Sequence, residues 1–461
     1  GEPIMVTQID MEGNFLFSDG RILSGFETRR GAIFRESAFK EDVDHLLSRY
    51  ANHGHPFARV SPKDFSVDSS GVKFSLLIEE GPRVVIEDLE VKGNEVTRPW
   101  VILREMGVRE GEIYCQDRIE RGRRRVGRLP FLVGAPEIEL RAAEGMEKVY
   151  LVVKISEGMM NRASGALGWA PGEDGELTGL VDLSLGNLFG TGRRIEARWR
   201  RVSPLSSSLE LAYAEPWFLG RGLDVSFQFS HAVRDTSYAE TGLALGVELP
   251  FGEELSGTSS VGWERVIPQA FPLPKTRKYK GSIGAVLDMR DDRKNPKRGV
   301  LYRFSTEYGY KWSFATELVP VPSQRARVLK GQFNFHHYLQ VFSNQVVYLS
   351  LNGGEVRSTE SYLPFVEHFR LGGGRTLRGY YEEQFSGERV AWANLEYRFL
   401  LGRNSRVAPF IDGGYFRYHT EAGALVKASK VAYGAGLRVG AGWGVFFLDY
   451  GLGEGDRPLE G

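Results

Sequence analysis

The sequence predicts two small α+β modules followed by a large antiparallel β-barrel that crosses a membrane. Three observations support this fold class. The first 158 residues repeat one pattern of strands and amphipathic helices. From residue 160 onward, long alternating segments separated by turns replace the helical periodicity. The chain of 461 residues also contains 56 glycines, about 12%, against a usual ~7%.

The composition excludes several functional classes. The 59 basic and 59 acidic side chains give a formal net charge of zero, so no bulk attraction to nucleic acid is expected. The single cysteine cannot form a disulfide within the chain or a cysteine-based metal cluster. No run of about 18 apolar residues is present, so no membrane helix is expected. The chain opens without the features of a signal peptide, and we interpret it as a mature or cut fragment.

The N-terminal part is predicted to contain two copies of one domain, at residues 1–82 and 83–158. A segment that ends in Gly13-Asn returns 80 residues later and ends in Gly93-Asn. Each copy closes with an alternating strand pattern followed by a Glu-Gly pair, which indicates a strand with one buried face. The spacing therefore predicts two homologous modules in tandem.

Amphipathic helices are expected inside each copy. In the second copy, six arginines surround the apolar positions Ile119, Val126 and Leu129. These arginines could bind acidic partners or lipid headgroups, but we favour a solvated helix face. Each copy is predicted to have the order strand–helix–helix–strand–strand. In the first copy, the apolar residues at helical spacing are Phe39, Val43, Leu46, Leu47 and Tyr50.

Residues 159–461 are predicted to form one β-barrel domain in an outer membrane, with apolar side chains facing lipid. A soluble sandwich gives the same alternation, so strand length decides between the two. The segments run for about ten residues or more, which suits a tilted membrane crossing of roughly 9–11 residues better than an average strand of about 5–6. Lipid offers the backbone no hydrogen bonds, so such a sheet must close on itself.

Fifteen strands are expected in this domain. Bacterial single-chain barrels have even strand numbers, so we infer a sixteen-stranded type whose last strand is absent from this chain. The predicted strands span residues 160–172, 176–189, 193–203, 207–216, 222–234, 237–250, 255–266, 278–290, 300–312, 326–342, 345–357, 389–401, 405–418, 426–440 and 443–454.

One connection is too long to be a turn. About 31 residues, from Ser358 to Glu388, separate the eleventh and twelfth predicted strands. A connection of this length is usually functional or disordered, and strand parity places it on the extracellular side. It contains the run Gly372-Gly-Gly-Arg-Thr-Leu-Arg-Gly-Tyr380. The run lacks the spacing of a phosphate-binding loop and no helix follows it, so phosphate binding is rejected.

The order of these features resembles the outer-membrane protein assembly superfamily of the BamA/TamA type. The two repeats resemble POTRA domains, and Leu377-Arg-Gly-Tyr380 resembles the signature loop motif of that family. The segment Phe410-Ile-Asp-Gly-Gly414 matches the family's F-x-D-x-G pattern. Weaker matches lie at Asn187-Leu-Phe-Gly-Thr-Gly192, at Glu215-Pro-Trp-Phe-Leu-Gly220 and at a strand-end motif formed by Asp288 and Arg290.

The resemblance implies that the long loop folds back into the barrel, where its arginine meets carboxylates. We expect Arg378, in a motif with Gly379 and Tyr380, to pair with Asp412 and with Glu396. Glu396 faces the lumen by the parity of its strand, whereas Asp412 is placed there by the family match. A buried arginine needs such partners, because an unpaired buried charge is costly and guanidinium suits bidentate pairing. A solvated loop arginine is the alternative.

No enzyme activity, metal site or cofactor is expected. The eight histidines are scattered, and His336 and His337 point to opposite faces of one predicted strand. No nucleophile-elbow motif is present. The acidic residues near Asp288 could bind a cation, but the neighbouring Arg290 favours a salt-bridged turn.

The resemblance also implies a location and a function. It places the chain in the outer membrane of a diderm bacterium, in contact with lipid, with the modules in the periplasm. It implies a factor that receives unfolded β-barrel or secreted clients, with periplasmic chaperones or accessory proteins, and templates their insertion at the barrel seam. The alternatives are a two-partner-secretion-type polypeptide transporter, a passive pore or structural membrane anchor, and a soluble β-rich binding protein.

Overall fold

A computed structural model divides into two compact units, which are described separately. The first comprises Gly1–Gly158 with Phe189–Thr191, and the second comprises Met159–Leu188 with Gly192–Gly461. No helix among the described residues is long and apolar enough to cross a membrane. The structure describes residues 4–68, 71–143, 145–158, 161–170, 176–203, 205–234, 237–269, 273–292, 295–316, 319, 324–402, 405–441 and 444–456.

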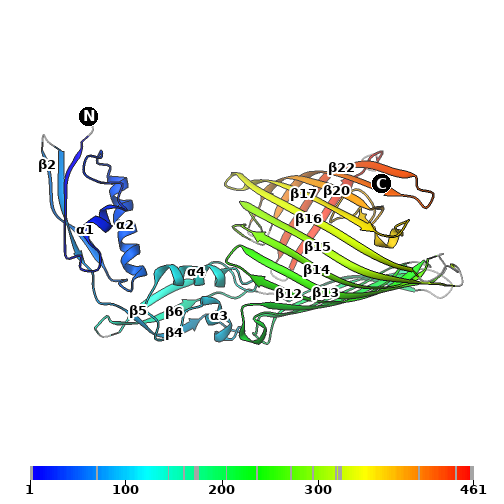
Figure 1. The fold of residues 1–461 in the computed structure, drawn as a ribbon, viewed down its shortest axis with the longest axis horizontal. Helices are drawn as coiled ribbons and strands as arrows, with labels where there is room; N and C mark the ends of the chain where they lie inside the picture. Colours follow the sequence, from blue (N-terminus) through cyan, green and yellow to red (C-terminus); the bar gives the residue numbers. More distant parts are fainter. Residues whose placement is uncertain are drawn as a thin grey trace. The chain divides into compact units, whose positions relative to one another are not determined.

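The first unit contains two modules with the same order of elements (Figure 1). In each module the first strand pairs in parallel with the third, and the second pairs antiparallel with it, giving the orders β1-β3-β2 and β4-β6-β5. The predicted order strand–helix–helix–strand–strand is confirmed. The elements are β1 (Val6–Glu12), α1 (Asp19–Leu23), α2 (Glu36–Asn52), β2 (Arg59–Asp68), β3 (Gly71–Glu79), β4 (Val85–Lys92), α3 (Pro99–Met106), α4 (Gln116–Gly127), β5 (Glu137–Ala142) and β6 (Lys148–Lys154).

The helices of these modules follow from local sequence. Leu46 and Tyr50 of α2 lie one turn apart and are both buried in the core of the first module. Helix α3 begins with Pro99, whose fixed φ suits the first helical turn. It ends at Gly107, which has the left-handed φ of 61° that favours glycine after a helix.

The arginine-rich helix α4 uses part of its charge inside its own module. Arg118 and Arg123 form ion pairs with Glu112 and Glu120. Arg125 donates through Nη2 to the carbonyl of Met106 at 3.0 Å. These arginines therefore have structural partners, which the interpretation as a solvated face did not include.

The repeated Gly-Asn and Glu-Gly pairs have equivalent roles in the two modules. Gly13 and Gly93 have φ values of 84° and 82°, and a Cβ at either would collide with a backbone carbonyl, that of Ile78 in β3 or that of Ile155 directly after β6. Only glycine allows the chain to pass so close to the strand.

The acidic residue of each Glu-Gly pair accepts backbone N–H groups from the loop that follows the first strand. Glu80 accepts from Leu16 at 2.7 Å, and Glu157 accepts from Val96 and Thr97 at 2.9 and 2.7 Å. The carboxylate thus satisfies donors at a loop where no backbone partner is available. The repeat visible in the sequence therefore reflects one shared loop geometry.

The second unit is a curled antiparallel sheet of fifteen strands in the described residues (Figure 1). All fifteen predicted strands are present, with bounds within three residues of those predicted, and the fold class is confirmed. Strands β7 and β23 lie at the two ends of the hydrogen-bonded order. The strands are β7 (Arg162–Ala170), β8 (Glu176–Leu188), β9 (Arg193–Ser203), β10 (Ser206–Glu215), β11 (Asp224–Arg234), β12 (Tyr238–Pro250), β13 (Leu255–Pro268), β14 (Lys275–Asp288), β15 (Gly299–Phe314), β16 (Gln324–Phe342), β17 (Gln345–Ser358), β20 (Arg389–Leu400), β21 (Arg406–His419), β22 (Leu425–Ala441) and β23 (Gly444–Leu452).

The two faces of this sheet carry opposite kinds of side chain. On the outer face, Ile283 and Val431 are 67% and 55% exposed. On the inner face, Lys311, Glu396 and Asp412 are 1%, 7% and 0% exposed. Apolar groups outside and charged groups inside are the reverse of a water-soluble domain and match a lipid-facing barrel.

The connection between β17 and β20, residues 359–388, folds against the inner face of the sheet and is called the interior loop. Its own apolar cluster joins Leu371 and Leu377 to Val390 and Phe416 of the neighbouring strands. This cluster packs part of the loop against the sheet, whereas Tyr381 of the same loop is 85% exposed. The loop contains a 3-10 helix, η2 (Phe365–Glu367), and a two-stranded hairpin of β18 (Phe369–Leu371) and β19 (Phe385–Gly387).

Candidate functional site

The arginine of the loop motif lies against two carboxylates on the inner face of the sheet. Arg378 donates to Asp412 of β21 through Nε at 2.8 Å, through Nη2 at 2.7 Å and through its backbone N–H at 3.0 Å. Its Nη1 donates to Glu396 of β20 at 2.8 Å. The structure thus brings together the three residues that the sequence singled out, and we call them the arginine anchor.

Charge and burial are balanced in the arginine anchor. Burial alone would lower the pKa of Arg378, but the hydrogen bonds to Asp412 and the charge of Glu396 raise it above its ordinary value. Glu396 also accepts from Arg398 at 2.7 Å, so two cations meet two carboxylates. The Arg378 guanidinium lies 3.5 Å from the ring centroid of Phe410, which adds a cation–π contact.

The next two motif residues contact the last strands of the sheet. Gly379 has a φ of 90°, and a Cβ there would collide with the backbone of Leu452. The Tyr380 hydroxyl donates to the carbonyl of Val431 at 2.9 Å and accepts from the N–H of Glu454 at 2.9 Å. The motif therefore fastens the loop to β22 and β23 as well as to β20 and β21.

Asp288 and Arg290 pair with each other where β14 ends. Arg290 donates through Nε and Nη2 to the two carboxylate oxygens of Asp288, at 2.8 and 2.9 Å. The neighbouring Asp291 accepts the backbone N–H of Lys297 at 3.0 Å. These contacts form a salt-bridged turn, and neither Asp288 nor Arg290 contacts Arg378 in the described structure.

A second group of ion pairs holds the first part of the interior loop, and sequence reasoning missed it. Lys278 of β14 and Lys311 of β15 lie directly opposite each other. Lys278 Nζ is 2.8 Å from Glu367 and 2.9 Å from Glu264, and Lys311 Nζ is 2.5 Å from Glu360 and 3.6 Å from Glu367. We call these five residues the lysine anchor.

The loop carboxylate at the centre of the lysine anchor lies beside both opposed lysines. Burial raises the pKa of Glu367, but the nearby Lys278 and Lys311 hold it below its ordinary value overall. Strand parity alone would have placed both lysines on the inner face. The register between β14 and β15 places the two lysines opposite each other. The path of the loop places Glu367 close to both.

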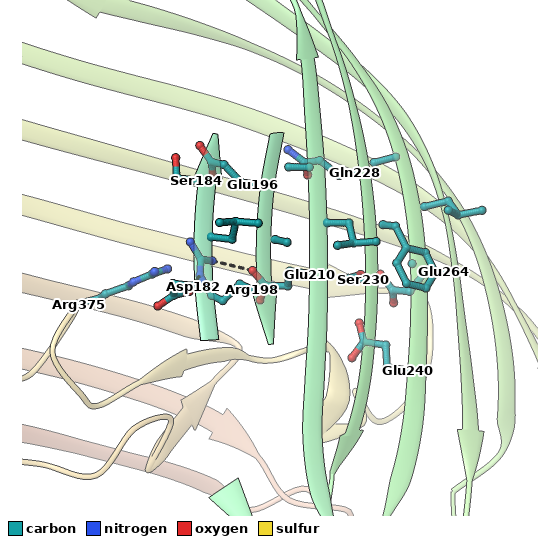
Figure 2. A pocket seen from close by; sticks show the side chains of 18 of the residues that line it. Asp182, Ser184, Glu196, Arg198, Glu210, Gln228, Ser230, Glu240, Glu264 and Arg375 are labelled. Atoms are coloured by element: carbon teal, nitrogen blue, oxygen red, sulfur yellow. Dashed lines mark hydrogen bonds and ion pairs between the residues drawn. The ribbon is translucent and has the colours of Figure 1, made fainter. Parts of the chain in front are cut away.

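A cavity of about 890 Å³ lies between the interior loop and the inner face of the sheet. Figure 2 shows Arg375 extending from the loop toward the wall that carries Asp182 and Glu210, where Arg198 pairs with Glu210 at 2.7 Å. The lining mixes charged side chains such as Glu240 and Lys280 with apolar ones such as Phe229. The charged groups of each anchor form ion pairs with one another, and such pairing suits attachment of the loop better than acid–base chemistry.

Comparisons with known proteins identify the family. The Omp85 superfamily domain matches residues 187–458, and the POTRA domain, a surface antigen variable number repeat, matches residues 4–81 and 84–158. The outer membrane protein assembly factor BamA of Nitratidesulfovibrio vulgaris is 23% identical over 452 residues, covering 88% of this chain and 54% of the relative. BamA of Neisseria meningitidis serogroup B is 22% identical over 425 residues, covering 80% and 51%.

Solved structures show the same fold. BamA from Haemophilus ducreyi lacking POTRA domains 1-3 has a TM-score of 0.59 and 16% identity, covering 99% of this chain and 97% of that one. CdiB from Acinetobacter baumannii has a TM-score of 0.55 and 12% identity, covering 98% and 86%. At these identities the likeness concerns the fold alone.

The family match extends over more than half of the chain, which spans about half the length of the curated relatives it matches. The resemblance inferred from the sequence is therefore confirmed. In this family the barrel lies in the outer membrane and the POTRA repeats lie in the periplasm. The chain belongs to the Omp85 superfamily, with two POTRA repeats ahead of its outer-membrane sheet.

Proposed function

We propose that this protein is an outer-membrane protein assembly factor. It receives unfolded β-barrel or secreted chains in the periplasm and templates their insertion at the seam of its sheet. The observation that carries the proposal is the alignment with relatives named assembly factor BamA, which extends over 88% and 80% of this chain. Coverage of that extent includes POTRA sequence as well as the sheet.

Open sheet edges can bind an unfolded client through backbone hydrogen bonds. In the orders β1-β3-β2 and β4-β6-β5, the edge strands β2 and β5 have outer backbone groups that can pair with an extended client. In the described residues, β7 pairs only with β8, so its other edge can receive a strand. A client that adds strands there satisfies its backbone before it meets lipid, where unsatisfied groups are costly. Client folding supplies the free energy, and no catalytic step is proposed.

The arginine anchor has a supporting role in this proposal. Arg378 joins β20 to β21, and the next motif residues contact β22 and β23. These strands lie at one end of the sheet order. A loop that holds them in place provides a rigid frame while pairing changes at the seam.

Folding of a client in liposomes tests the proposal. Liposomes that contain the purified protein are mixed with a urea-unfolded outer-membrane barrel, and the protease-resistant client is followed with time. We expect faster client folding than in empty liposomes, and a severalfold loss of that gain in Arg378→Ala. Arg375→Ala is the matched control. It removes an arginine of the same loop that extends into the cavity (Figure 2) and is not part of the arginine anchor. Equal rates with and without the protein would reject the assembly function.

The same preparations separate the remaining alternatives. A photo-crosslinker placed in β7 should capture the client strand if the seam templates insertion. Movement of a soluble polypeptide into the liposomes, without client folding, would indicate a secretion transporter. A stable conductance that survives Arg378→Ala would indicate a passive pore. Periplasmic chaperones and accessory proteins are the further partners we propose for the POTRA repeats.

A further inference from the structure

We propose that the lysine anchor is a second fastening point of the interior loop, independent of the arginine anchor. Glu360 and Glu367 are then positioning residues, which hold the first part of the loop in place whether or not Arg378 is bound. This inference concerns the loop itself and does not require the assembly function. It rests on the register between β14 and β15, and on the fact that Glu360 and Glu367 come from the loop.

The strand register places two lysines opposite each other, and carboxylates of the interior loop compensate their charge. Lys278 and Lys311 are directly opposed across β14 and β15, and like charges in that relation are destabilising. Both side chains are buried, with exposures of 6% and 1%. Buried charges are tolerated only with close partners of opposite sign. The two strands therefore require carboxylates at this position.

The sheet provides only part of that compensation. Glu264 of β13 contacts Lys278 at 2.9 Å, but it also contacts Lys280 at 2.9 Å. Glu307 of β15 also lies 3.7 Å from Lys280, but the carboxylates that contact Lys311 are Glu360 and Glu367 of the loop. Glu367 contacts both opposed lysines, at 2.8 and 3.6 Å. Without the loop, Lys311 would lose both of the carboxylates that contact it in the described structure.

The two anchors share no residue and lie on different parts of the sheet. The lysine anchor uses β13, β14 and β15, whereas the arginine anchor uses β20 and β21. Strands β16 and β17 separate them in the hydrogen-bonded order. Along the loop, the β18 strand of the hairpin lies between Glu367 and Arg378. Within each anchor the cations contact carboxylates of the same anchor, and one further cation, Lys280 or Arg398, pairs with Glu264 or Glu396. Loss of one anchor therefore leaves the charges of the other compensated, and their effects should be additive.

Hydrogen–deuterium exchange of the full chain in lipid nanodiscs tests this independence. Arg378→Ala should raise amide exchange in residues 372–381 and leave residues 360–369 close to the wild-type rate. Lys311→Glu places a carboxylate beside Glu360 and Glu367, and should raise exchange in residues 360–369 by roughly a hundredfold or more, because a buried ion pair becomes a repulsion. Lys427→Glu on β22, outside both anchors, is the matched charge-reversal control and should leave both segments unchanged.

A charge swap separates positioning from general damage. Lys311→Glu combined with Glu360→Lys restores an opposed pair, and it also places the introduced carboxylate opposite Lys278. We expect the swap to return exchange in residues 360–369 to within about threefold of wild type. If Lys311→Glu does not fold, recovery of folding in the swap supports the proposal equally. Equal loosening of both segments in Arg378→Ala, or failure of the swap to rescue, would overturn it.

Discussion

The POTRA unit and the barrel sheet bury opposite kinds of side chain. The first POTRA module has a core of aromatic and aliphatic groups such as Phe17, Leu46 and Phe74. The sheet instead buries Lys311, Glu396 and Asp412 on its inner face and exposes apolar side chains on its outer face. Alternating polar and apolar residues therefore build a water-soluble module in one unit and a lipid-facing sheet in the other.

The difference teaches that stability has a different origin in each unit. The POTRA modules gain from removing apolar surface from water, which is a nondirectional effect. The sheet has lipid on its apolar face, so its interior is held by directional ion pairs that must be complete. The first unit should be most sensitive to lost volume, and the second to lost charge partners.

The largest effect is expected from a missing partner inside the sheet. Asp412→Ala leaves Arg378 buried with Glu396 as its remaining ion-pair partner among the described residues, and Arg398 also shares that carboxylate. Breaking a buried pair costs about 3–5 kcal/mol. Urea unfolding in detergent micelles, followed by tryptophan fluorescence, measures the free energy of unfolding. Asp44→Ala on the exposed surface of α2 is the control, and a cost in Asp412→Ala no larger than that control would contradict the charge-based account.

A lost volume in the POTRA core should have the next largest effect. Leu151 of β6 is completely buried, and Leu151→Ala should destabilise its module by about 2–5 kcal/mol through lost burial and a cavity. Hydrogen exchange of the strand amides of β6 measures the opening free energy. Leu329→Ala on the outer face of β16 is the contrast, since it opens no cavity and alanine stays apolar toward lipid. Equal costs at the two sites would mean that the units do not differ in this respect.

A matched pair of valines tests which solvent each unit faces. Val431 of β22 and Val67 of β2 are each 55% exposed, and both lie in strands. Val431→Lys places a charge toward lipid and should cost about 2–4 kcal/mol near the bilayer centre. Val67→Lys places it in water and should stay within about 0.5 kcal/mol. Unfolding in phospholipid vesicles measures both variants, and equal costs would argue against a lipid-facing outer surface.

The smallest effect is a pH dependence confined to the second POTRA module. Burial raises the pKa of Glu157, but hydrogen bonds from Thr97 and from the backbone of Val96 lower it below its ordinary value of 4.5 overall. A lower pKa in the folded state means that the stabilisation is present above about pH 4.5 and lost as the pH falls through the folded value. Thermal unfolding between about pH 3 and pH 7, read from Trp100 fluorescence, should show this loss. Glu157→Gln should abolish it, and an unchanged pH profile in that variant would exclude Glu157 as the cause.

The sequence predicted one anchor and missed the other for a physical reason. Arg378 stood out because its loop is unusually long and its motif resembles a known one, and strand parity turned Glu396 inward. Lys278 and Lys311 also had inward parity, but so do many charged residues of these strands. Their significance comes from direct opposition across β14 and β15, and no periodicity within one strand reveals which residue of the next strand lies opposite.

By itself, the sequence determined the order of the elements, the number of strands in the sheet and the face on which the alternating side chains of most strands lie. These properties depend on local periodicity, on glycine placement and on the alternation that a strand imposes on its own side chains. Only the tertiary structure decided the register between strands and the path of the interior loop. Both depend on contacts between residues far apart in the chain, as Lys311 and Glu360 or Arg378 and Asp412 show.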